Sequence, residues 1–90
     1  MTPQAAQILA LQALGWIAGE ENYLQALLER TGALGADLQA RAADPEFLGA
    51  VVDFLLENEE ILVAFCAAEN IRPEQPMQAR HVLPGATPEW

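Results

Sequence analysis

The acidic side chains near the middle of the chain are the first candidates for chemistry. Asp53, Glu57 and Glu60 share one face if a single helix continues through Asn58, because they are spaced i, i+4 and i+7. Grouped carboxylates bind hard cations such as Mg²⁺ or Ca²⁺, but the sequence has no Asp-rich calcium loop and no Glu-x-x-His pair. We therefore predict no metal site and expect a solvated acidic face. The alternative is an acidic patch for a basic protein partner, made of Glu20, Glu21, Glu57, Glu59 and Glu60.

The single histidine and the single cysteine are the other reactive side chains. His81 has no Cys or Ser nearby in the sequence to complete a zinc site or a triad, so we interpret it as a helix-end residue. Cys66 shares a helical face with Ile61, Leu62 and Phe65, where a thiol packs as a small apolar group. The sequence also has no phosphate-binding loop, nucleophile elbow, Cys-x-x-Cys pair or dinucleotide fingerprint. We therefore predict no enzymatic activity, no catalytic residue and no cofactor.

Two groups of aromatic residues have different interpretations. Trp16 and Tyr23 lie at helical spacing, which favours core packing over a ligand pocket. Trp90 follows Pro88 and Glu89 at the chain end, where no helix is expected. Two interpretations of Trp90 stay open: docking in a groove of this molecule or a neighbour, or a disordered end.

The segment from Leu28 to Arg41 has the pattern of a helix-turn-helix, namely the end of a helix, a glycine turn and a short second helix. In DNA-binding versions the second helix places polar and basic side chains in the major groove. Here that helix offers Asp37, Gln39 and Arg41, with Glu29 beside the turn. We favour a plain corner between two helices. The alternative is a DNA-associated regulatory protein that uses the corner Thr31–Arg41.

Composition limits the partners. The 90 residues include thirteen Asp and Glu, four Arg and no Lys, for a net charge of -9, which disfavours nucleic acid and anionic membranes. A lone cysteine, no signal peptide and no long apolar segment predict a complete small cytoplasmic protein. Yet 52% of residues are hydrophobic, more than one small core hides. This surplus predicts a non-enzymatic protein-protein interaction module, with a homodimer or another protein as partner.

The elements that position these residues are all predicted to be helices, because Ala, Leu, Glu and Gln dominate and no alternating strand pattern occurs. We expect an all-α, compact bundle of five or six short helices in one domain, 1–83, followed by an irregular tail, 84–90. Capping residues and stops predict helices from Pro3 to about Ile17, Glu20 to Gly32, Ala36–Ala43, Pro45 to Asn58, Asn58 to Asn70 and Pro73 to about Val82. Thr2, Asp44 and Asn58 are predicted to cap the first, fourth and fifth helices, and Gly19 to stop the first in a left-handed conformation. The fourth helix is apolar almost all round between Phe47 and Leu56, which predicts that it is buried on most sides.

A weak internal repeat connects the two halves at an interval of about 38 residues. Trp16-Ile17 precedes Tyr23-Leu24 at the distance that separates Phe54-Leu55 from Ile61-Leu62. This pattern indicates two pseudo-repeated three-helix units. The alternative is that Ala- and Leu-rich helices are alike by composition alone.

The chain also resembles a known family. The segments that carry the resemblance are Leu14–Gly19, Arg41–Leu48, Val52–Leu56 and Ala64–Ala68, and it covers about residues 8–83. The family consists of short alphaproteobacterial proteins known only as a domain of unknown function. The resemblance implies a small helical cytoplasmic protein and supplies no activity, cofactor or site residue.

Overall fold

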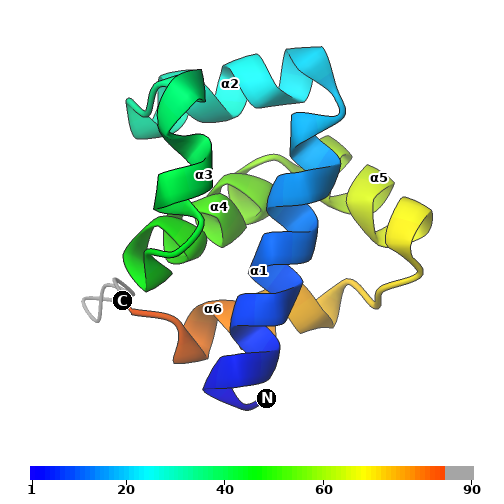
Figure 1. The fold of residues 1–90 in the computed structure, drawn as a ribbon. Coiled ribbons are helices and arrows are strands. Elements are labelled where there is room, and N and C mark those ends of the chain that lie inside the picture. Colours follow the sequence, from blue (N-terminus) through cyan, green and yellow to red (C-terminus); the bar gives the residue numbers. More distant parts are fainter. Residues whose placement is uncertain (85–90) are drawn as a thin grey trace.

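The computed structural model describes residues 1–84, which form six α-helices and one 3₁₀ turn, η1 (Figure 1). No strand occurs in this range, so the predicted all-α bundle is confirmed. The predicted tail, apart from Pro84, lies outside the described residues. The elements are α1 Pro3–Ala18, α2 Glu21–Thr31, η1 Gly35–Asp37, α3 Leu38–Arg41, α4 Pro45–Glu57, α5 Glu59–Glu69 and α6 Glu74–Val82.

Helices α1 and α4 begin with the same capping chemistry. The side-chain oxygens of Thr2 and Asp44 accept hydrogen bonds from the backbone N–H groups of Ala5 (3.1 Å) and Glu46 (3.0 Å). A proline occupies the first helical position after each cap, where its missing N–H removes no intrahelical bond. Both predicted starts are confirmed.

Helices α2 and α5 end in the same way, through a residue in the left-handed region. Gly32 has φ 75° and Asn70 has φ 56°, and their N–H groups donate to Leu28 O and Cys66 O respectively. Glycine and asparagine are the residues that adopt this conformation at least cost. Both predicted stops are confirmed.

Three local predictions were wrong. Gly19 has φ −82°, because a right-handed turn leads into α2 within two residues. Asn58 occupies the predicted N-cap position of α5, but its side chain makes no capping bond there; its Nδ2 instead donates to Phe54 O (2.8 Å), which satisfies a carbonyl at the end of α4. The predicted helix Ala36–Ala43 is shorter, since its first turn winds as η1 and only Leu38–Arg41 is α-helical.

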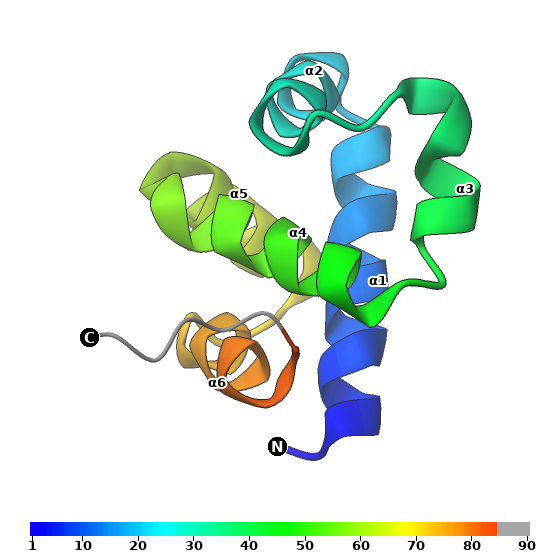
Figure 2. The same ribbon diagram turned by 90° about the vertical axis from the view of Figure 1, so that its left-hand side faces the viewer.

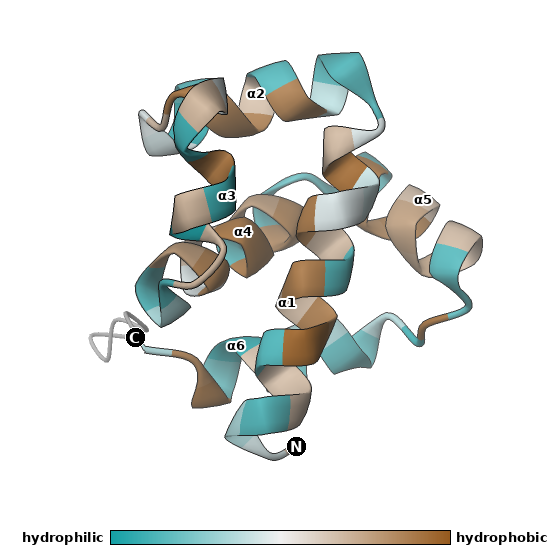
Figure 3. Ribbon diagram, viewed as in Figure 1, coloured by the Kyte–Doolittle hydropathy of each residue, from teal (hydrophilic) through white to brown (hydrophobic). Residues whose placement is uncertain are grey.

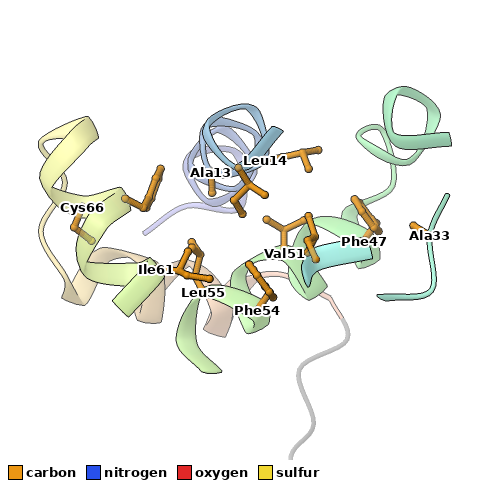
Figure 4. Packing of buried hydrophobic residues seen from close by; sticks show 12 residues of the cluster. Ala13, Leu14, Ala33, Phe47, Val51, Phe54, Leu55, Ile61 and Cys66 are labelled. Atoms are coloured by element: carbon orange, nitrogen blue, oxygen red, sulfur yellow. The ribbon is translucent and has the colours of Figure 1, made fainter. Parts of the chain in front are cut away.

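Helix α4 is the central element of the molecule. In Figure 2 it lies between α2 and α6, while α1 runs alongside all three. Phe47, Val51, Phe54 and Leu55 pack into one cluster with residues of α1, α2 and α5 (Figure 4). Leu48 and Val52 pack into a second cluster with α1 and α6. The prediction of a helix buried on most sides is confirmed, and each of these side chains stabilises the fold by about 1.5–3 kcal/mol.

The 38-residue interval is visible in the helix boundaries but ends at the third helix of each half. Adding 38 to the bounds of α2 gives those of α5, and the left-handed residues are also 38 apart. Helix α3, however, has four residues and buries none of them, whereas α6 has nine and buries three. Equivalent local signals therefore lead to different packing.

Helix α1 is the longest helix of residues 1–84, with 16 residues, and it contains no charged side chain. It stands at the front of the molecule in Figure 1, with its inner face against α2, α4 and α6. No helix in the described part of the chain combines the length and apolar character needed to cross a membrane.

Candidate functional site

A shallow groove between α2 and the α4–α5 junction is the candidate binding pocket. Its volume is about 480 Å³ and it opens widely to solvent. The ring of Phe54, which is 2% exposed, belongs to the core beneath it. The lining consists of Ala26, Glu29, Arg30, Phe54, Glu57 and Asn58.

An ion pair between α2 and α4 occupies this groove. Arg30 Nε donates to Glu57 Oε1 (2.7 Å) and Arg30 Nη2 donates to Glu57 Oε2 (2.8 Å), a bidentate arrangement. The hydrogen bond from Arg30 lowers the pKa of Glu57, and the same bond raises the pKa of Arg30. Glu57 is therefore ionised near neutral pH and holds no proton to give as a general acid.

A second ion pair joins α4 to α6, one turn before Glu57 on α4. Arg80 is 8% exposed, and its Nε donates to Asp53 Oδ1. Its Nη1 donates to the carbonyl oxygens of Leu83 (3.2 Å) and Pro84 (3.4 Å) just beyond the end of α6. A Cβ at Gly49 would lie 2.7 Å from Pro84 O and 3.2 Å from Arg80 Nη1. Gly49 thus allows the chain after α6 to pass close to α4.

The expectation of a solvated acidic face at Asp53, Glu57 and Glu60 agrees with the exposure of Glu57 and Glu60, but it did not include the pairing of Asp53 and Glu57 with arginines. Asp53 and Glu57 share a face of α4, but each is paired with an arginine from another helix. Glu60 lies on α5, because the chain breaks at Asn58. Within residues 1–84, no three His, Cys, Asp or Glu side chains converge in a way that could hold a metal ion.

The corner Thr31–Arg41 has a different geometry from a two-helix motif of full length. The chain after Gly32 runs through the 3₁₀ turn, and α3 contains only Leu38–Arg41. The guanidinium carbon of Arg41 lies 5.8 Å from the ring centre of Phe47, so this cation stacks on the protein's own surface.

The remaining sequence candidates have packing or helix-end roles. Cys66 is buried, and burial raises the pKa of its thiol, which confirms core packing. The ring of Trp16 lies 5.4 Å from that of Tyr23 and 5.6 Å from that of Phe65, so these aromatic side chains are part of the core. His81 is exposed in the last turn of α6. Trp90 lies outside the described residues.

Exposed apolar side chains on α1 are the feature that sequence reasoning missed. Ile8 is 58% exposed and Leu11 is 43% exposed. In Figure 3 the side of α1 that faces the viewer includes hydrophobic residues, and no other helix crosses in front of it. The available signal was a second set of residues at three- and four-residue spacing, opposite the buried set. The other large exposed apolar side chains of residues 1–84 are Met1, Leu34, Val63 and Met77.

Comparison with known proteins identifies one family. Residues 3–86 match the family described as protein of unknown function, DUF3572. No curated protein and no solved structure is significantly similar to this chain. The chain therefore belongs to the DUF3572 family, as its resemblance to a domain of unknown function predicted.

Proposed function

We propose that this member of the DUF3572 family is a non-enzymatic module that binds a protein chain through the outer surface of α1. The observation that carries the proposal is the exposure of Ile8 and Leu11 on a helix without charge, in a chain of net charge -9. Exposed aliphatic side chains are stabilised when a partner removes them from water, by about 25 cal/mol for each Å² of apolar surface.

The state of the polar groups supports a role without catalysis. In the groove, Arg30 donates two hydrogen bonds to the carboxylate of Glu57. Cys66 is buried, and burial raises the pKa of its thiol. A nucleophile or general acid would need the opposite, namely a free group whose pKa favours proton transfer near neutral pH.

The same geometry favours the interaction module over a DNA-associated protein. Helix α3 has four residues and extends only about 6 Å, less than a recognition helix needs to follow the major groove. Arg30 and Arg80 are already paired with carboxylates, and Arg41 stacks on Phe47.

Location and source complete the proposal. A single buried cysteine fits the reducing cytoplasm, and the net charge of -9 disfavours anionic membranes and nucleic acid as partners. The resemblance at Leu14–Gly19 and Arg41–Leu48 supports an alphaproteobacterial source.

Photo-crosslinking in cells tests the proposal with a matched control. A photoreactive residue at Ile8 should give a defined crosslinked species, and Leu11→Glu should abolish it. The same residue at Val63, which is 56% exposed on α5, should not give that species. If position 8 yields no crosslink to any protein chain, or only the products of position 63, α1 is not a binding surface.

A further inference from the structure

The outward side of α1 carries a continuous seam of exposed residues. The members are spaced by four, three, four and three residues, which is the a/d spacing by which one helix packs along another. The residues buried in the core lie on the opposite side, among them Ala6, Ala10, Ala13 and Ile17. The outer seam consists of Gln4, Ile8, Leu11, Gly15 and Ala18, all exposed.

We infer that the outer seam binds the same seam of a second copy of this chain, forming an antiparallel α1–α1 pair across a two-fold axis. This inference rests on the proposed function and names its partner. The spacing fits a helix, and a two-fold contact needs one surface that is complementary to itself.

Charge is the reason to choose a second copy. Each chain carries a net charge of -9, so two copies repel each other wherever their acidic side chains face. Helix α1 has no charged residue over 16 positions, so its seam brings no like charges into contact. Helix α1 itself offers no carboxylate to a basic partner. Beside the seam, the carboxylate of Glu69 on α5 accepts a hydrogen bond from Gln12 Nε2 (3.0 Å).

The sizes of the side chains favour the antiparallel order. In this order Ile8 faces Leu11 of the second copy and Gln4 faces its Gly15. A Cβ at Gly15 would have no atom within 4 Å, so there is open space above it for the longer glutamine. A parallel pair would place two glycines opposite each other, and would also align the two helix dipoles unfavourably.

The contact is small, and the dimer is accordingly weak. Sixteen residues give a helix about 24 Å long, and a contact between single helices belongs to the low end of interface sizes. The dimer should therefore dissociate on dilution, and it should gain little or nothing from low salt because the seam is uncharged.

Sedimentation equilibrium of the purified full chain is the decisive measurement. The mass should rise from 9.8 kDa toward twice that value, 19.6 kDa, as concentration approaches about 1 mM. Ile8→Glu should hold the mass at 9.8 kDa, because it places a charge in the seam. Val63→Glu should leave the dimer intact; it is the matched control, since Val63 is as exposed as Ile8 and both variants should fold. Circular dichroism checks the fold of each. A wild-type chain that stays monomeric, or two variants that behave alike, overturns the inference.

Disulfide trapping tests the order of the two helices. Ile8→Cys mixed with Leu11→Cys should crosslink faster under mild oxidation than either variant alone, while the buried Cys66 stays reduced. Faster crosslinking of Ile8→Cys with itself contradicts the antiparallel order. A monomeric chain whose position 8 still captures another protein in cells would remove the self-pairing and leave the proposed function standing.

Discussion

Two arginine–carboxylate pairs link one face of α4 to two other helices, α2 and α6, and they differ in how exposed their side chains are to water. Each joins residues 27 positions apart, and their carboxylates, Asp53 and Glu57, are one turn apart on α4. The side chains of Arg30 and Glu57 are 44% and 49% exposed, whereas those of Arg80 and Asp53 are 10% and 33% exposed. Water screens the first pair, so it contributes little; the second is an integral part of the packing of α6 on α4.

The difference shows that pairing alone does not determine the importance of a charge. Helix α2 is held mainly by apolar contacts such as that of Leu27, so Arg30 adds a surface link. Beyond α6, two backbone carbonyls depend on Arg80 for hydrogen bonds. Removing Arg80 therefore affects a carboxylate and a chain segment together.

We call Arg80–Asp53 the inner pair and Arg30–Glu57 the outer pair, because the side chains of the first are less exposed. The largest expected effect comes from breaking the inner pair. Arg80→Ala should lower the free energy of unfolding by about 3–5 kcal/mol, because it leaves Asp53 and the carbonyls of Leu83 and Pro84 without their donor. Urea unfolding measures the loss. Arg30→Ala is the matched control and should cost less than about 1 kcal/mol. Equal losses would mean that burial does not distinguish the two pairs.

Next in size is the effect of a methyl group beside the inner pair. Gly49→Ala should destabilise the chain by about 1–3 kcal/mol, because the added Cβ would lie 2.7 Å from Pro84 O. Gly15→Ala on the exposed side of α1 should have the opposite sign and stabilise by about 0.5–1 kcal/mol, since its Cβ meets no atom within 4 Å. Thermal unfolding of both variants at low protein concentration measures the two signs; a stabilising Gly49→Ala would contradict the close approach.

Removing the charge of Asp53 while keeping its shape should have an intermediate effect. Asp53→Asn keeps an oxygen that can accept the Arg80 Nε–H bond but loses the charge, so we expect a loss of about 1–2 kcal/mol. A double-mutant cycle with Arg80→Ala measures the coupling between the two residues. The corresponding cycle for Arg30 and Glu57 should give a smaller coupling that decreases further with added salt. Salt-insensitive coupling in the outer pair would contradict its exposed setting.

The smallest predicted effect is the pH dependence of the outer pair. The pKa of Glu57 is lowered from 4.5 in the folded chain, so its contribution is complete above pH 4.5 and is lost as pH falls through the folded value. The stability difference between wild type and Glu57→Gln should therefore be below about 1 kcal/mol at pH 7 and should shrink below pH 4.5. Urea unfolding at a series of pH values measures it. A stability difference that grows on acidification would contradict the lowered pKa of Glu57.

Much of the local structure could be predicted from the sequence, because caps and stops act within a few residues. Thr2, Asp44, Gly32 and Asn70 have the predicted roles, since each satisfies backbone groups of its own helix. The predicted capping bond of Asn58 was wrong because this residue lies between two helices. Its side chain forms a hydrogen bond with α4, the helix before it, and none with α5.

The helical class of this chain, most of its helix boundaries and the burial of α4 follow from the order of its residues. The pairing of Arg30 with Glu57 and of Arg80 with Asp53, and the exposure of Ile8 and Leu11, follow from the packing of the helices. The physical reason is that helix signals are short-range, whereas ion pairs across 27 residues and the free side of a helix depend on how the helices pack. The apolar surplus predicted that apolar side chains would stay exposed, and only the packed helices show that Ile8 and Leu11 of α1 are among them.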